Sequence, residues 1–454
     1  STTCVELIRC ANGRARPGSG LYRQTPKNMR YLPLMGSLSR NLTTIGLAGI
    51  LATGCVFSSL EEDLDRLDDI AHLFSGVVTS NSAANNAIVV VALQERNPDS
   101  IESYRMMPGA GAFEIRARAR PTRFFAFADK NRDLTYQTSE PFGWANRGNP
   151  IDPAAGSTED IRIEIGVEQT GAPRFPAALV NQPLDDHLNN YVRPAIGEVT
   201  PLDNPLFSRE RAEQGLWTPF AFIEDGGAGI HFLKPYDPDL VPVLFVHGIN
   251  ATPRDFTSMI DALDTTKYQA WVLSYPSGLR LSWVARGLYQ FLDVLHRQYD
   301  FDELHVVAHS MGGLVSRGGI NLCTQNDSCD FLATFTSVST PWNGVESAVN
   351  GVKWAPTAVP VWHDLDPGSE YITTLFDTGL PDELDYHLIF GYRHDNLFGA
   401  ESSDGVIKLT SQLRHDAQLG AETVRGFDEG HVSILDNIIV IEKIYTAIDD
   451  GSDR

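Results

Sequence analysis

From about residue 229 onward, short apolar runs alternate with longer stretches in which apolar residues recur every three or four positions. The runs at 241–246, 270–275 and 303–308 predict buried strands, and the stretches at 254–263 and 281–299 predict helices between them. Strands that alternate with helices favour a mostly parallel sheet covered by helices on both faces. This pattern therefore predicts an α/β domain.

The part of the chain before this domain has a different pattern of apolar and polar residues. Short β-like runs at 88–92, 112–117 and 122–128 are separated by Pro, Gly and Asn, which favours a small sandwich. We predict an all-β, sandwich-like accessory domain over 86–194.

Two further segments complete the expected organisation. Residues 56–85 carry many acidic side chains among leucines at helical spacing, which indicates an acidic tether or short helix. Residues 195–215 are rich in Pro, Asp and Glu, which suits a linker. The α/β domain is then expected to occupy 216–448.

The length and the net charge of the chain limit the number of domains and the kinds of partner that we expect. A chain of 454 residues exceeds what one hydrophobic core usually organises, so two domains are expected. The net charge of -22 argues against a nucleic-acid partner, which would need a positive surface. The sequence contains no P-loop, dinucleotide-binding glycine pattern or zinc signature, so we expect no cofactor.

The N-terminal region has the order of features typical of bacterial export. We expect 1–34 to be a non-native or disordered extension, because it lacks apolar periodicity, and 35–55 to be a signal peptide. Arg40 precedes an apolar run that is too short to span a bilayer and that ends in small residues and Cys55. The pattern resembles a bacterial lipobox, although Ala52 stands where leucine is more usual.

That resemblance implies that Cys55 carries a lipid and anchors the mature protein to a membrane of the bacterial cell envelope. Val56 follows the cysteine, so the aspartate that retains lipoproteins at the inner membrane is missing and the outer membrane is favoured. The alternative is a buried apolar helix with an incidental thiol.

Cys323 and Cys329 form a second cysteine feature. Five polar residues separate them, a spacing that lets a small disulfide close in an oxidising environment. Zinc is the alternative, but two cysteines without a nearby histidine do not complete its tetrahedral shell.

One loop of the β-rich region has oxygen ligands in the order of a calcium loop: Asp129, Asn131, Asp133 and Glu140. Leu134 stands where such a loop needs glycine, and β-like residues precede it. A polar hairpin turn is favoured, and calcium remains an open alternative.

The strongest motif is the run from Ala308 through His309, Ser310 and Met311 to Gly312. A strand that enters a helix through a serine strains the backbone of that serine, so the residues two before and two after must be small. Ala308 and Gly312 meet this need, which predicts Ser310 as a nucleophile. The alternative is a helix start with a capping serine.

A second loop can supply hydrogen-bond donors for acyl transfer. The predicted strand 241–246 ends in His247, Gly248, Ile249 and Asn250. Acyl transfer builds negative charge on a carbonyl oxygen, and two fixed N–H groups stabilise it. We assign these donors to Ile249 and Met311.

Five motifs, at 247–256, 309–313, 339–344, 403–406 and 430–433, resemble in their order the α/β-hydrolase superfamily. The likeness is greatest to bacterial triacylglycerol lipases and GPI inositol-deacylase-like hydrolases, and it covers about 229–447. It implies an α/β-hydrolase fold.

The same resemblance implies the other catalytic residues. Asp404 stands where the family has its acid, and His431, in a loop that opens the final helix, stands where the family has its base. Asp395 is the rival acid and His415 the rival histidine. His247 precedes the serine, whereas the base of this fold follows it.

Together these features predict a lipase- or esterase-like serine hydrolase that cleaves carboxylic esters through an acyl-enzyme on Ser310, with an ester or lipid as substrate. An acyltransferase or amidase would use the same residues. A surface-binding lipoprotein with an inactive hydrolase domain is the alternative from another class.

Overall fold

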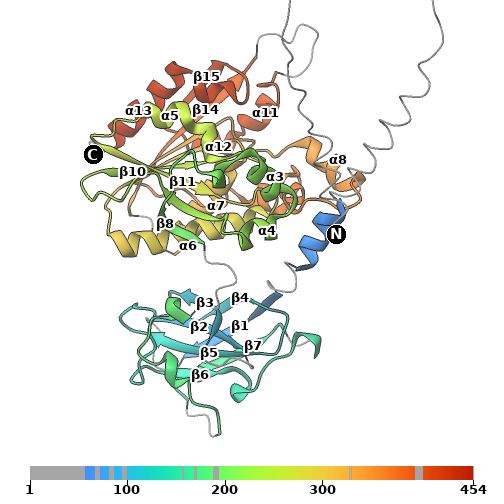
Figure 1. The fold of residues 1–454 in the computed structure, drawn as a ribbon, viewed down its shortest axis with the longest axis vertical. Helices are drawn as coiled ribbons and strands as arrows, with labels where there is room; N and C mark the ends of the chain where they lie inside the picture. The colour runs from blue at the N-terminus through green and yellow to red at the C-terminus, as the bar shows by residue number, and fades with distance from the viewer. Residues whose placement is uncertain are drawn as a thin grey trace, which may run out of the picture.

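The computed structural model describes residues 57–66, 72–80, 86–94, 100–155, 158–167, 171–187, 194–326, 328, 330–393 and 402–452. The expected extension at 1–34 and the signal peptide with Cys55 lie outside these residues. Figure 1 shows a β-rich body, drawn in blue to green, and a larger α/β body, drawn mainly in green to red.

The α/β body is built on an eight-stranded sheet in the order β15-β14-β13-β12-β10-β11-β9-β8. β9 pairs antiparallel with β11, and the other neighbours pair parallel, which confirms the predicted mostly parallel sheet. The strands are β8 (Ala195–Val199), β9 (Gly229–Phe232), β10 (Val241–Val246), β11 (Tyr268–Ser274), β12 (Leu304–His309), β13 (Leu332–Val338), β14 (Asp385–Tyr392) and β15 (Thr423–Asp428).

Helices cover both faces of this sheet. Along β10, Leu244 and Val246 pack in one cluster with α6 and α7, whereas Val243 and Phe245 pack in another with α5 and α13. Alternate side chains of a strand point to opposite faces, so both faces are buried. The helices are α3 (Arg209–Trp217), α4 (Pro219–Glu224), α5 (Thr257–Asp261), α6 (Leu281–Tyr299), α7 (Met311–Gln325), α8 (Glu346–Trp354), α9 (Pro360–Leu365), α10 (Glu370–Thr374), α11 (Leu409–Gln412), α12 (His415–Leu419) and α13 (Ile438–Ser452).

The β-rich body is a small sandwich, as the short β-like runs predicted. A three-stranded sheet, β4-β1-β7, and a four-stranded sheet, β3-β2-β5-β6, both contribute buried side chains to one core, among them Phe74, Ile88, Phe124 and Ile163. The strands are β1 (His72–Ser80), β2 (Ala87–Gln94), β3 (Ile101–Met107), β4 (Ala112–Ala117), β5 (Thr122–Asp129), β6 (Phe142–Trp144) and β7 (Ile161–Ile165).

Two domain boundaries differ from the expected ones. The acidic segment is helical only at 57–66, and β1 already belongs to the sandwich. The expected linker 195–215 contains β8, which pairs with β9 at the edge of the large sheet, and most of α3. A half-exposed edge strand carries too few apolar residues to be read from its sequence.

The loop with calcium-like spacing forms a polar hairpin. The Asp129 carboxylate accepts backbone N–H groups of Asp133 and Leu134 at 3.3 and 3.0 Å, and the Glu140 carboxylate accepts two more. Within the described ranges, no group of three or more His, Cys, Asp or Glu residues is arranged to hold a metal ion. Among the same residues, no helix has the length and hydropathy of a membrane span.

Candidate active site

Ser310 lies at the turn between β12 and α7. Its backbone has φ 54° and ψ -128°, a conformation that costs a non-glycine residue about 1–3 kcal/mol. At this turn α7 comes very close to β10. A Cβ on Gly312 would lie only 2.2 Å from the Val246 carbonyl oxygen. The strained serine is thus held by packing around a glycine that no larger residue can replace without a shift of the backbone.

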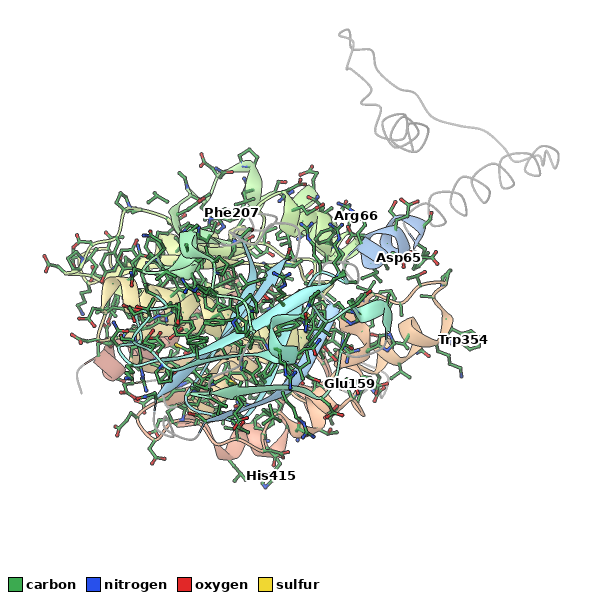
Figure 2. The ribbon with its side chains drawn as sticks, turned by 90° about the horizontal axis from the view of Figure 1, so that it is seen from below. Asp65, Arg66, Glu159, Phe207, Trp354 and His415 are labelled. Carbon is green, nitrogen blue, oxygen red and sulfur yellow. The ribbon has the colours of Figure 1, made fainter. Side chains whose placement is uncertain are left out.

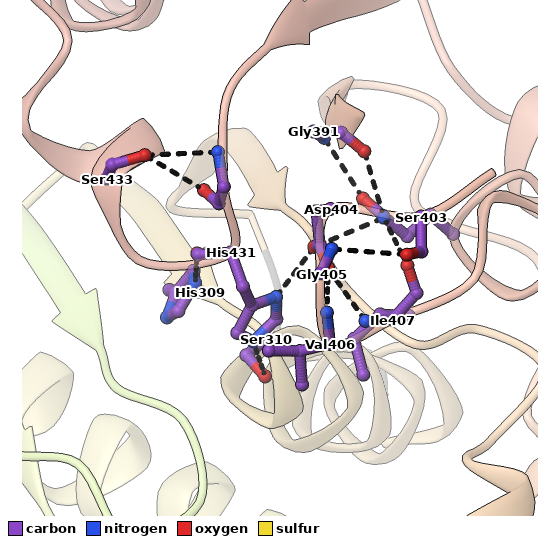
Figure 3. Close-up of polar contacts among 12 residues, drawn as sticks. His309, Ser310, Gly391, Ser403, Asp404, Gly405, Val406, Ile407, His431 and Ser433 are labelled. Atoms are coloured by element: carbon purple, nitrogen blue, oxygen red, sulfur yellow. Dashed lines mark hydrogen bonds and ion pairs between the residues drawn. The ribbon is translucent and has the colours of Figure 1, made fainter. Parts of the chain in front are cut away.

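His431 lies in the loop that follows β15, directly beside Ser310 (Figure 3). Its Nε2 is 2.9 Å from Ser310 Oγ, and its Nδ1 is 2.7 Å from Asp404 Oδ2. A carboxylate that accepts the Nδ1 proton leaves Nε2 free to accept the proton of the serine hydroxyl. The structure brings together three residues that the sequence singled out at distant positions.

Asp404 is buried and fixed by several donors. Its Oδ1 accepts the backbone N–H groups of Val406 and Ile407 at 2.9 and 2.7 Å. Its Oδ2 accepts Gln412 Nε2 at 3.2 Å in addition to the His431 ring. These bonds orient the carboxylate toward His431.

His309 adds a contact that sequence reasoning missed. Its buried Nε2 donates to the backbone carbonyl oxygen of His431 at 2.7 Å. Burial, and secondly the nearby His431 ring, lowers the pKa of His309 to about 3. A neutral His309 therefore ties the strand of the nucleophile to the loop of the base.

The loop 247–250 passes close to the nucleophile. A Cβ on Gly248 would lie 2.9 Å from Ser310 Cβ, so glycine allows this approach. Met311 is the first residue of α7, and its N–H has no acceptor within the helix. Ile249 and Met311 both line the cavity at Ser310, and their assignment as oxyanion donors stays a prediction.

Three side chains hold this loop from outside. Asn250, at φ 50°, donates its N–H to Ser277 Oγ at 3.0 Å and accepts Arg209 Nη1 on its carbonyl at 3.0 Å. Tyr275 donates its hydroxyl to the His247 carbonyl at 2.6 Å. The loop motif by itself does not reveal these partners, because they come from distant segments of the chain.

His247 itself shapes the loop. Its ring stacks on Tyr275 with the centroids 4.3 Å apart, and its Nδ1 hydrogen-bonds the Gly248 carbonyl. Burial lowers the pKa of His247 to about 4, which keeps the ring neutral.

Ser310 and His431 open into a cavity of about 520 Å³. α8, α9 and the loop before α8 supply an apolar part of the cavity wall, while Trp342 packs in the core. The apolar side chains of the lining are Ile249, Ala251, Met311, Pro341, Val345, Ala348, Trp362, Leu365, Val406, Ile407, Val432 and Leu435.

Of the remaining candidate residues, only His415 and Cys323 lie in the part of the chain that the structure describes. His415 is exposed on α12. Asp395 and Cys329 lie outside the described residues. Cys323 is disulfide-bonded, and its pairing with Cys329 stays a prediction.

No family model and no curated protein matches the sequence. Among solved structures, the chain is similar to a lipase of Bacillus licheniformis in its mature form, with 16% identity, a TM-score of 0.38 and coverage of 48% of this chain and 97% of that chain. It is also similar to a gene product of Listeria innocua, with 15% identity, a TM-score of 0.35 and coverage of 46% and 94%. For lipase B of Aspergillus fumigatus the identity is 16%, the TM-score 0.38 and the coverage 55% and 60%.

Proposed function

We propose that this chain is a serine hydrolase of the α/β-hydrolase superfamily, which cleaves carboxylic esters through an acyl-enzyme on Ser310. One observation carries the proposal: the hydrogen-bond series from Asp404 through His431 to Ser310, with the serine at a strained strand-to-helix turn. A hydroxyl in this setting loses its proton to the histidine as it attacks.

The first half-reaction transfers the acyl group to the enzyme. Ser310 Oγ attacks the ester carbonyl carbon, and His431 Nε2 takes the serine proton. The carbonyl electrons move to its oxygen, which accepts N–H bonds from Ile249 and Met311. When the tetrahedral intermediate collapses, the bond to the alcohol breaks and His431 gives its proton to the departing alcohol.

The second half-reaction releases the acid. A water molecule attacks the acyl-enzyme, and His431 takes a proton from it. Collapse of the new tetrahedral intermediate returns the proton to Ser310 Oγ and frees the carboxylic acid. The described residues supply every proton transfer, so the proposed reaction needs no cofactor.

The apolar wall of the cavity supports an ester with an apolar acyl part. Val345, Ala348 and Leu365 offer surface that gains from burial of hydrocarbon. The proposal therefore extends to a lipase- or esterase-like activity. The lipobox resemblance at Cys55 extends it to a protein anchored to the bacterial envelope.

Intact-protein mass spectrometry after rapid acid quench tests this function. With an excess of a soluble ester, the wild-type chain should gain the mass of the acyl group on Ser310, and Ser310→Ala should gain none. Appearance of the free acid separates hydrolysis from transfer to another acceptor. A folded wild-type chain that forms no adduct and turns over no ester would favour the binding lipoprotein.

A further inference from the structure

The helix at 57–66 is part of the α/β body, although the β-rich body follows it in the chain. Leu60 is fully buried in the core that contains α6 and α7. Asp63 is also buried, and its two carboxylate oxygens accept the N–H groups of Phe220 and Ala221 at 2.7 and 2.9 Å, at the start of α4. A carboxylate at a helix N-terminus satisfies donors that otherwise lack partners. This helix is therefore docked on the body that carries the active site.

A series of aromatic rings connects the start of this helix to the wall of the catalytic cavity. Phe57 meets Trp217 edge to face at 5.8 Å, and Trp217 meets Trp362 in the same way at 6.0 Å. Trp362 lines the cavity and packs on α8, where a Cβ on Gly351 would lie 2.9 Å from the ring. The first turn of the helix and α8 are thus joined by three packed rings.

α8 has two different faces. Val345, just before it, and Ala348 line the catalytic cavity. On the opposite side Val349 is 40% exposed. At the C-terminal end of α8 Trp354 is 74% exposed, and Lys353 Nζ lies 5.0 Å from the centre of its ring. Figure 2 shows Trp354 projecting outward at the same side of the molecule as the docked helix.

Trp354 and Lys353 are the residue types that favour a boundary between water and lipid. A tryptophan buries its ring among lipid groups and keeps its N–H in a polar layer, and a neighbouring lysine extends its ammonium group toward water. Val349 and Trp354 are both exposed on α8, so two apolar side chains are available for contact with lipid.

We propose that the exposed side chains Val349 and Trp354 of α8 and the start of the helix 57–66 form one lipid-facing rim, which seats the mouth of the catalytic cavity on a lipid surface. The occupant follows from where the chain leads: Cys55 precedes Phe57 by two residues, which span about 7 Å at most. A lipid on Cys55 would therefore lie beside this rim. The substrate class becomes an ester embedded in a lipid surface, and this inference rests on the proposed function.

The rim gives a geometric reason for the docked helix. A flexible tether would let the cavity face any direction, whereas contacts through Leu60, Asp63 and Phe57 hold it at one orientation relative to the anchor. An ester could then enter the apolar cavity from the lipid surface with little exposure to water. Glu61, Glu62 and Asp65 are exposed on the same helix, which keeps its later turns in water.

The ratio of two hydrolysis rates tests the rim: the rate on an ester embedded in phosphatidylcholine vesicles and the rate on a soluble short-chain ester. In the double variant Val349→Ser and Trp354→Ser of the full chain, the ratio should fall about tenfold, because two exposed apolar groups no longer enter lipid. The rate on the soluble ester should stay unchanged, since neither residue lines the cavity. Leu419→Ser, which removes a 72% exposed leucine from α12, is the matched control and should leave the ratio unchanged.

Vesicle flotation separates the possible outcomes further. The full chain with Cys55→Ser, which cannot carry the lipid, should float with the vesicles less after the α8 substitutions. An unchanged rate ratio in the double variant would overturn the rim, and so would a change in oligomeric state without an effect on the vesicle rate. If the parent chain binds vesicles through α8 but hydrolyses neither ester, the rim stands and the proposed function fails.

Discussion

His309, the residue before the nucleophile, donates its Nε2 proton to the backbone carbonyl oxygen of His431 at 2.7 Å. The two rings lie 4.8 Å apart, and Ser310 is bonded to the same His431 ring. The strand that delivers the serine therefore also fixes the loop that delivers the base. This relationship makes His309 a positioning residue of the site.

Replacement of His309 should weaken the reaction without weakening substrate binding. In His309→Ala the loop of His431 loses one anchor, so we expect kcat on a soluble ester to fall about ten- to hundredfold with KM nearly unchanged. His415→Ala, which changes an exposed histidine on α12, is the control and should leave both constants as they are. A kcat for His309→Ala equal to that of the wild type would show that the bond does not position the base.

Buried histidines should make the fold sensitive to acid. Burial lowers the pKa of His309 to about 3 and that of His247 to about 4, from an ordinary value of 6.5. Between these values the unfolded chain binds more protons than the native chain, so the free energy of unfolding decreases as the pH falls below 6.5. Each group can remove up to about 1.4 kcal/mol per pH unit.

Denaturant unfolding at several pH values measures this effect. His309→Asn should show a smaller decrease in the free energy of unfolding between pH 6.5 and pH 5 than the wild type. Equal decreases in the two proteins would mean that His309 does not carry the predicted pH dependence.

Asp404 should be the acid of the catalytic series. Asp404→Asn loses the negative charge that orients the His431 tautomer, so we expect the rate to fall by about four orders of magnitude. Asp395→Asn should retain wild-type activity. Loss of activity in Asp395→Asn with a nearly active Asp404→Asn would move the acid to Asp395.

A side chain at position 248 should slow the reaction, because it would crowd the nucleophile Ser310. A Cβ at this position would lie 2.9 Å from Ser310 Cβ and 3.3 Å from Ser310 Oγ. We expect Gly248→Ala to lower kcat/KM about a hundredfold, because the loop that carries Ile249 must move away from the oxyanion. Gly379→Ala, where a Cβ meets no atom within 4 Å, is the control and should remain fully active.

Much of the fold could be predicted because its signals are local. The strand 241–246 and the helix 281–299 are found at those residues, since a buried parallel strand carries a continuous apolar run and a covering helix carries an apolar stripe. β8 was missed because it is a half-exposed edge strand. The docking of the helix 57–66 depends on Asp63 and the start of α4, which lie far apart in the sequence.

The residues of the site also fall into those that local sequence predicts and those that depend on contacts between distant segments. Ser310 could be predicted from the small residues around it, because backbone strain at the turn restricts its immediate neighbours. The partners of Asp404 and Asn250, Gln412 and Arg209, could not be predicted, since each bond depends on how separate loops meet in space.

Labelling by a fluorophosphonate probe tests the central claim most directly, because only a serine activated by a histidine reacts rapidly with it. The wild-type chain should be labelled at Ser310, Ser310→Ala should take up no label, and His431→Ala should be labelled far more slowly. Ser316→Ala, which changes another buried serine of α7, should be labelled like the wild type. A folded wild-type chain without label, or equal labelling of Ser310→Ala, would contradict the account of Ser310 as the nucleophile.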